Sequence, residues 1–367
     1  MVLRSDLKEF PELSHHAFQH AWDSQATATL RQVPGLSRVV RFISENGSEP
    51  FLNYENISSR LRVNAQQYPS LYRQYVRMAQ VLDVRKLPAL YIETTPTINA
   101  FAMGIENYSI VLCSGLVDVM DEVELLAILG HELGHVKCEH QLYKTVAYLV
   151  TTFGDAILSQ AKIPGIDLVL SAGRLGLEFA LMDWSRKAEL SCDRAALLAT
   201  QDADAVASAL AKLAGFSRKY ASELNLDEVE HQSEAYRELG NESIMIKMMQ
   251  LQTMRSQTHP YPVVRVKEIR HWARSVEYDS ILAGNYRRHA AVLQGGAWQN
   301  VTIESPRARE CAKCKYPCNE DYLFCPSCQS NTRVGRLLCG KCRKPVEQTW
   351  SACMGCGSWL TPTPPPS

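Results

Sequence analysis

Two histidines with a glutamate beside the first are the residues best suited to chemistry in this chain. His131, Glu132 and His135 form an HExxH motif, and on a helix the two imidazoles share one face, about one turn apart. This spacing suits two nitrogen ligands of one zinc ion. Glu132 lies beside the metal, where it can take a proton from a water molecule whose pKa zinc lowers toward ~7. The pattern therefore predicts zinc-dependent peptide hydrolysis without a covalent intermediate.

A hydrolytic zinc site needs a third protein ligand and one open position. Glu189 is the candidate for that ligand, and Asp193 lies one turn further along the same helical face. Asp193 can accept a hydrogen bond from the far nitrogen of a ligating histidine. Three nearby residues could compete as ligands, although a packed thiol or a solvated imidazole is the simpler interpretation of each: Cys138, His140 and Cys192.

The elements that must position these residues follow from hydrophobic periodicity. The spacing predicts helices over residues 1–85, three short strands at 87–94, 99–102 and 109–112, a helical pair at 143–180 and a helix at 189–198. Asp121, with Glu124 three residues later, is typical of a helix start and predicts that the motif begins about two turns inside its helix. Pro164 and Gly165 predict a break between the paired helices.

The end of the chain is rich in cysteine. Nine of the twelve cysteines lie in the last 57 residues, and eight of these form four CxxC pairs. Two CxxC turns complete one closed tetrahedral zinc site. Sequential pairing gives a first structural site, Cys311, Cys314, Cys325 and Cys328, and a second, Cys339, Cys342, Cys353 and Cys356. Pairing alternate turns is also possible but closes longer loops, and Cys318 is left as a spare thiol.

Together these features predict a mainly α fold with a small β-sheet (α+β), in which a zincin-like helical metallopeptidase domain precedes a small double zinc-ribbon module. The predicted domains are an N-terminal helical region (1–85), a catalytic domain (86–283), a linker (284–306), the double zinc ribbon (307–360) and a Pro-rich tail (361–367).

Charge argues against nucleic acid as a partner. The whole chain has 39 basic and 39 acidic residues. From residue 307 onward nine Lys or Arg and four Asp or Glu give +5, which two zinc–tetrathiolate sites of about −2 each reduce to about +1. Protein recognition through Tyr322, Trp350 and Trp359 is the alternative, unless these aromatics pack between the ribbons.

The sequence predicts a cytoplasmic protein without a transmembrane segment. Its first residues lack the apolar core of a secretory signal. The most apolar region, 146–182, is interrupted by charged residues and by Pro164, so no stretch approaches the ~20 apolar residues of a spanning helix. Cytoplasmic thiols stay reduced, which favours metal binding over disulfides.

Four parts of the chain, in order, resemble the HtpX-like and CAAX-prenyl-protease family of zinc metallopeptidases, which are of the gluzincin type. The matching parts are 99–102 with 114–116, the motif helix at 126–136, Glu189 with Asp193, and the His-Pro element at 258–266. Many relatives are anchored by spanning helices, and this chain shows none. A prenylated or membrane substrate is therefore not carried over.

The resemblance implies zinc on His131, His135 and Glu189, with Glu132 as the general base. It also offers His259 and Arg265 for stabilising the tetrahedral oxyanion. A strand that pairs with extended substrate backbone is implied at Asn99, Ala100, Phe101 and Ala102.

We therefore expect a zinc-dependent endopeptidase with one catalytic and two structural zinc ions. Its ribbons would recruit a protein substrate or partner, or regulate access to the site. One alternative is a catalytically silent peptidase fold that acts as an adaptor, binding proteins through its zinc ribbons, although an adaptor has no need of Glu132 beside its metal. Another is a zinc hydrolase that acts on something other than peptides, which the predicted substrate strand disfavours.

Overall fold

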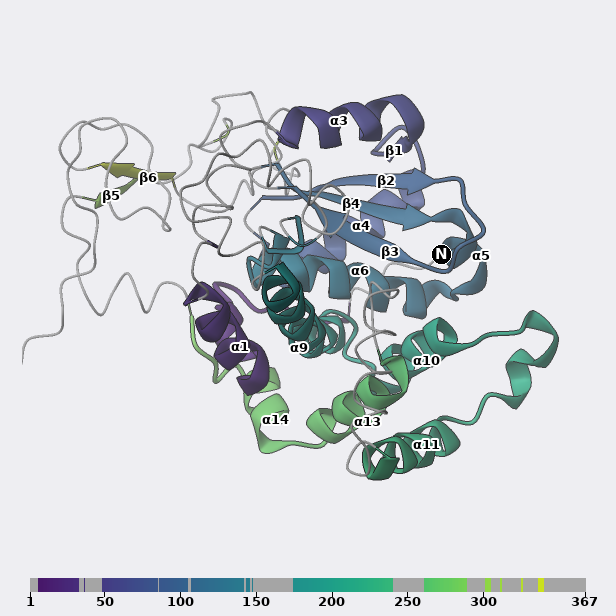
Figure 1. The fold of residues 1–367 in the computed structure, drawn as a ribbon. Helices are drawn as coiled ribbons and strands as arrows, with labels where there is room; N and C mark the ends of the chain where they lie inside the picture. Colours follow the sequence, from purple (N-terminus) through teal and green to yellow (C-terminus); the bar gives the residue numbers. More distant parts are fainter. Residues whose placement is uncertain are drawn as a thin grey trace, which may run out of the picture.

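The computed structural model describes residues 6–32, 36, 48–84, 86–104, 107–141, 143–145, 147, 174–239, 261–288, 301–304, 311, 325 and 336–339. The predicted break at Pro164, the Pro-rich tail and most of the predicted ribbon module lie outside these residues. Figure 1 shows the arrangement of the described helices and strands.

Helices make up most of the described chain. They are α1 (Ala21–Arg31), α3 (Ser48–Ser59), α4 (Pro69–Val81), α5 (Ser114–Val119), α6 (Glu122–Lys137), α9 (Arg174–Thr200), α10 (Ala203–Ala214), α11 (Leu226–Leu239), α13 (Pro262–Ala273) and α14 (Val276–Leu282), with 3-10 turns at His15–Ala17 and Arg218–Glu223. The strands are β1 (Leu61–Val63), β2 (Ala89–Glu93), β3 (Ala100–Met103), β4 (Ser109–Cys113), β5 (Val301–Glu304) and β6 (Arg336–Cys339). The described part of the chain is thus mainly α with a small sheet, as predicted.

Four strands form one mixed sheet in the order β1-β2-β4-β3. Strand β4 is parallel to β2 and antiparallel to β3, and every residue of β4 is buried. In this order β3 is the last strand of the sheet, as far as the described residues show. The three predicted strands are confirmed. Strand β1 corrects the all-helical prediction for residues 1–85, because its three residues are held by antiparallel pairing with β2 and not by local preference.

Helix α6 carries the HExxH motif through the middle of the fold. Asp121 caps it by accepting hydrogen bonds from the backbone N–H groups of Val123 and Glu124, and the Glu124 carboxylate accepts one from the N–H of Asp121. This capping box confirms the predicted helix start. Every residue from Glu124 to Val136 is buried, since α6 lies between the sheet and α9 (Figure 1).

One hydrophobic core runs across the predicted boundary between the N-terminal region and the catalytic domain. It includes Phe10 and Tyr75 from the first segment, and Leu129 and Val266 from the second. Tyr286, just inside the predicted linker, packs against the same core and donates a hydrogen bond to the carbonyl of Pro11. The predicted linker also contains β5, which pairs antiparallel with β6. Within 284–306 the structure describes residues 284–288 and 301–304, and the linker stays a prediction.

Two glycines let α6 and α9 touch backbone to backbone. A Cβ atom on Gly130 would lie 2.7 Å from Cβ of Ala199, and one on Gly134 would lie 2.7 Å from Cβ of Ala195. Both distances are well below van der Waals contact between carbons. Since α6 carries the motif and α9 carries Glu189, this contact sets the spacing of the residues predicted to bind zinc.

We expect Gly130→Ala to lower the free energy of unfolding by about 1–3 kcal/mol, because the added methyl overpacks a rigid helix contact. Chemical denaturation measures this change. The double variant Gly130→Ala/Ala199→Gly should recover much of the loss, and Gly215→Ala, where no atom lies within 4 Å of the new Cβ, is the matched control. Equal stability of the Gly130 and Gly215 variants would contradict the proposed close contact.

Candidate metal centre

Helices α6 and α9 bring together the three side chains predicted to bind zinc. Nε2 of His131 lies 3.2 Å from Oε2 of Glu189, and Nε2 of His135 lies 3.3 Å from Oε1 of the same carboxylate. All three side chains are buried. Two imidazole nitrogens and one carboxylate thus meet in the protein interior.

The ammonium group of Lys144 lies against these donors. Its Nζ is 2.7 Å from Nε2 of His135 and 3.0 Å from Oε1 of Glu189. The positive charge of Lys144 therefore lies beside the His135 and Glu189 atoms that would bind a metal ion. An ammonium group can only donate, so Nε2 of His135 presents its lone pair. Imidazole nitrogens and a carboxylate are a donor set that zinc binds, so these residues fit a zinc ion.

Asp193 lies behind the first histidine. Nδ1 of His131 is 3.0 Å from Oδ1 of Asp193, and an ionised carboxylate can only accept. Nδ1 therefore carries a proton, and Nε2 is the nitrogen that faces Glu189 and would bind zinc. Burial raises the pKa of Asp193, but the charge of Arg265 and its hydrogen bonds outweigh this effect and lower the pKa overall.

Arg265, on α13, pairs with both Glu189 and Asp193 of α9. Its Nε and Nη2 donate to Asp193 at 2.8 and 2.6 Å, and its Nη1 lies 3.2 Å from Oε2 of Glu189. The residue is only 3% exposed. This position suits anchoring of the two carboxylates, whereas stabilisation of an oxyanion stays a prediction. His259 lies outside the described residues.

Two of the proposed competitor ligands, His140 and Cys192, lie against the other ring nitrogen of His135. Nδ1 of His140 is 3.2 Å from Nδ1 of His135, and Sγ of Cys192 is 3.0 Å from the same atom. His131, His135 and Cys192 have atoms close enough to share a metal ion. Glu189, however, faces Nε2 of both histidines, so the Nε2 side offers a carboxylate and the Nδ1 side a thiol. Burial raises the pKa of Cys192 well above its usual value.

A buried aspartate continues the network away from the metal position. Asp23, on α1, is fully buried, and its Oδ2 lies 3.1 Å from Nε2 of His140. Burial raises the pKa of Asp23, but its hydrogen bonds with His140, Ser191 and Gln19 lower it to about 2. Asp23 is therefore ionised at neutral pH.

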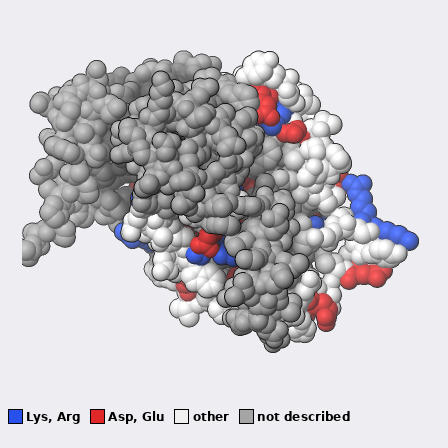
Figure 2. Space-filling model, in the orientation of Figure 1, with Lys and Arg blue, Asp and Glu red and all other residues white. Residues whose placement is uncertain are grey.

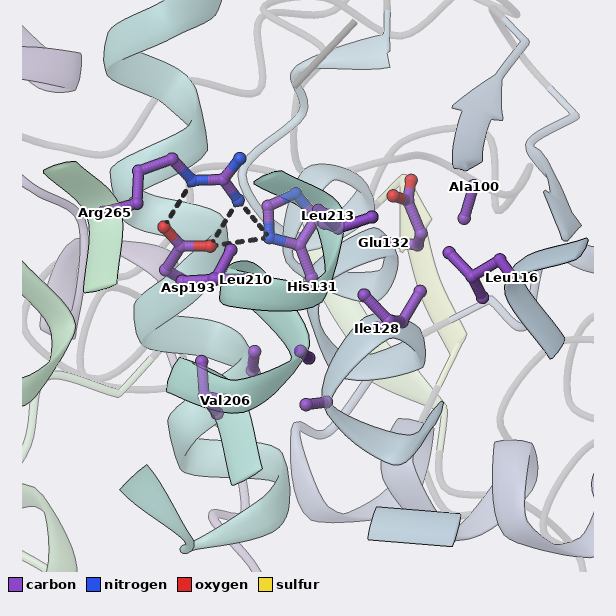
Figure 3. A pocket seen from close by; sticks show the side chains of 13 residues that line it. Ala100, Leu116, Ile128, His131, Glu132, Asp193, Val206, Leu210, Leu213 and Arg265 are labelled. Carbon is purple, nitrogen blue, oxygen red and sulfur yellow. Dashed lines mark hydrogen bonds and ion pairs between the residues drawn. The ribbon is translucent and has the colours of Figure 1, made fainter. Parts of the chain in front are cut away.

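A mostly apolar pocket adjoins the motif (Figure 3). Figure 3 shows Arg265, Asp193 and His131 on one side, and Glu132 with Ala100 and Leu116 on the other. Four polar or charged residues line the pocket: His131, Glu132, Asp193 and Arg265. The rest of the lining is small or aliphatic: Ala100, Leu116, Ala127, Ile128, Ala196, Val206, Ala209, Leu210 and Leu213. Strand β3 therefore contributes to the pocket that contains Glu132.

In the predicted ribbon module, the structure describes the side chains of two cysteines. Cys311 and Cys325 are each 1% exposed and belong to one buried cluster, and neither forms a disulfide bond. They come from the first two CxxC pairs. The other cysteines of the predicted zinc ligand set have no described side chain.

The visible surface of the described residues carries acidic and basic side chains side by side (Figure 2). Within the described ranges, no helix is both long enough and apolar enough to cross a membrane.

Comparison with known proteins gives one family and several relatives. The model of "Peptidase family M48" matches residues 65–273. The chain is 34% identical over 275 residues to "Plastoglobule-localized metallopeptidase 48, chloroplastic" of Arabidopsis thaliana, which covers 74% of this chain and 77% of that protein. It is 30% identical over 171 residues to "Protease HtpX homolog 1" of Streptomyces coelicolor, covering 42% of this chain and 56% of the relative. No solved structure matches.

The sequence motifs predicted the proposed zinc ligands better than the residues that surround them. The HExxH helix, Glu189 and Asp193 were found from spacing. Sequence reasoning missed Asp23 and Lys144, because each lies in a segment without a motif of its own. For Lys144 the available signal was its place in the predicted helix that follows the motif helix. The Arabidopsis relative is named for the chloroplast, so the cytoplasmic location of this chain stays a prediction.

Proposed function

The chain belongs to peptidase family M48, as an HtpX-like zinc metalloprotease, and on that premise we propose an endopeptidase that cuts extended protein segments with Glu132 as its base. The observation that carries the proposal is the convergence of His131, His135 and Glu189 with Glu132 in the adjoining pocket. Hydrolases of this type require these groups together.

Zinc would be held by Nε2 of His131, Nε2 of His135 and the carboxylate of Glu189. When bound there, zinc supplies the Lewis acidity that activates a water molecule and polarises the substrate carbonyl. Asp193 keeps the proton of His131 on Nδ1, and Arg265 holds both Asp193 and Glu189 in place. Cys192 then acts as a packed thiol and not as a ligand, because it lies on the Nδ1 side of His135.

Glu132 accepts a proton from the attacking water and passes it to the amine that leaves. Its side chain is only 1% exposed and lines the pocket, so competing bulk water is largely excluded from the carboxylate. The oxyanion of the tetrahedral state needs a donor. Since Arg265 is engaged by two carboxylates, His259 is the better of the two predicted donors.

Substrate binds by adding an extended strand to β3, which includes Ala100, Phe101 and Ala102 and follows Asn99. The position of β3, last in the order of the four-stranded sheet and lining the pocket through Ala100, supports this, because a strand added to a sheet selects extended chains. The apolar pocket beside Glu132 accepts an apolar side chain next to the cut bond, through contacts with Leu116, Ile128 and Leu213. Unfolded protein segments carry both features.

The C-terminal cysteines form two structural zinc sites, and the module recruits substrate or a partner protein or regulates access to the active site. The burial of Cys311 with Cys325 supports sequential pairing of the first two CxxC turns, since alternate pairing would join the first turn to the third. The chain would then bind three zinc ions, one catalytic and two structural.

Metal analysis with a peptidase assay tests this proposal. We expect three zinc equivalents per chain and cleavage of an unfolded protein such as reduced casein, with apolar residues beside the mapped cuts. A chelator should abolish cleavage and added zinc should restore it, while a Glu189→Ala chain should lack one zinc equivalent. A chain that holds three zinc ions and cleaves no protein would favour the adaptor alternative.

A further inference from the structure

A chain of hydrogen bonds links Asp23 to the proposed zinc ligand His135. Oδ2 of Asp23 lies 3.1 Å from Nε2 of His140, and Nδ1 of His140 lies 3.2 Å from Nδ1 of His135. All three side chains are at most 2% exposed. The other ring nitrogen of His135, Nε2, faces Glu189.

A carboxylate at one end and an uncharged histidine in the middle give each bond a direction. A carboxylate only accepts, so Nε2 of His140 carries a proton and donates it to Asp23. We take His140 as uncharged, so that its Nδ1 has a lone pair that accepts the Nδ1 proton of His135. This leaves the lone pair of His135 on Nε2, the atom that would bind zinc.

Asp23 is itself held rigidly. Besides His140, its carboxylate accepts hydrogen bonds from Ser191 at 2.6 Å, Gln19 at 3.0 Å and Thr27 at 3.2 Å. Ser191 lies on α9, two residues after Glu189. Asp23 therefore ties α1 both to His140 and to the helix that carries the third proposed ligand.

The Nδ1 atoms of the two proposed histidine ligands thus contact different groups. His131 donates directly to Asp193, whereas a second histidine stands between His135 and its carboxylate. This carboxylate comes from α1, which precedes the part of the chain that the family model matches, residues 65–273.

We propose that Asp23 and His140 are positioning residues of the metal centre, which hold the proton of His135 on Nδ1 so that Nε2 is available to zinc. This inference rests on the proposed function, because it takes His135 as a zinc ligand. The competing arrangement has the thiol of Cys192 donating to Nδ1 of His135, which would place the histidine proton on Nε2 instead.

Zinc affinity of the full-length chain tests the proposal. The zinc equivalent that a Glu189→Ala chain lacks identifies the site, and competition with a chromophoric chelator measures its Kd. Asp23→Asn keeps the shape of the side chain but brings an N–H group that can donate to His140. We expect it to bind this zinc about 10–100-fold more weakly. Gln19→Met removes a different hydrogen bond to the same carboxylate and should bind zinc nearly as well as wild type.

A spectroscopic measurement separates positioning from a general loss of structure. Long-range ¹H–¹⁵N NMR spectra of chains labelled at histidine report which ring nitrogen carries the proton. In the wild type we expect the proton of His140 on Nε2 and that of His135 on Nδ1. The opposite tautomer of either ring in the wild type would overturn the proposal, whether or not the variant folds.

Each outcome bears on a different claim. Unchanged zinc affinity in a folded Asp23→Asn chain overturns the positioning role and leaves the proposed peptidase intact. Weaker zinc binding with unchanged tautomers also overturns it, in favour of a purely structural role for Asp23. A wild-type chain that has no zinc equivalent dependent on Glu189 contradicts the proposed function itself.

Discussion

Replacing Glu132 by glutamine is expected to lower kcat/KM for an unfolded protein substrate by about 10³–10⁴-fold while the zinc content stays unchanged. Glutamine has nearly the same shape as glutamate but cannot take a proton from water. Glu132 is buried and lines the pocket beside His131, and it is not one of the converging ligands. The loss should therefore appear in catalysis and not in metal binding. Fluorescence of a quenched casein substrate, measured beside metal analysis, separates the two.

The same experiment has a natural control within the motif helix. Glu124, on α6, is also buried, but it caps the helix and accepts a hydrogen bond from Lys212. A Glu124→Gln chain should lose stability and keep its kcat at temperatures where it is folded. If Glu132→Gln retained more than about a tenth of wild-type kcat/KM with its zinc bound, a different group would have to be the base.

Replacing Arg265 by methionine is expected to lower the free energy of unfolding by about 3–5 kcal/mol. The guanidinium is 3% exposed and pairs with two buried carboxylates, Asp193 and Glu189. Methionine fills similar volume but leaves Asp193 without its main positive partner in a site of low dielectric constant. For a domain of this size, the loss corresponds to a fall in Tm of about 6–20 °C, which scanning calorimetry measures.

Arg270 provides the matched control, because it lies on the same helix and also pairs with two acidic residues. Its Nη1 lies 2.8 Å from Asp227 and 3.0 Å from Glu230, but the side chain of Asp227 is 73% exposed. Solvent screens such a pair, so Arg270→Met should change Tm only slightly. Similar losses for the two variants would mean that Arg265 is not a buried anchor of the metal centre.

The parts of the fold that the sequence predicted are those that depend on local patterns. The capping box at Asp121 and Glu124 involves residues three apart, and the HExxH spacing needs only one helical turn. Strands β2, β3 and β4 have apolar runs bounded by turn residues. In each case neighbouring residues contain enough information to place the element.

The parts that sequence reasoning missed depend on contacts between distant residues. Strand β1 exists because Arg62 pairs with Tyr91 across the sheet, and β5 because Ile303 pairs with Leu337. Asp23 and Ser191, 168 residues apart, meet in a hydrogen bond. Periodicity cannot reveal such pairings, since the partner lies in another element. Arg265 was found by resemblance, but its contact with Asp193 followed only from the structure.

Residues that contact each other around the proposed metal centre are synthesised at different times, because α1 lies near the start of the chain and α13 far along it. Asp23 leaves the ribosome early and Arg265 much later, and at about 5–20 residues per second their synthesis is separated by tens of seconds. In the later part of that interval the nascent chain already contains the HExxH helix and Asp193, but Asp193 still lacks its guanidinium partner from α13. The anchoring of Asp193 behind the proposed zinc ligand His131 is thus completed only after α13 has been made.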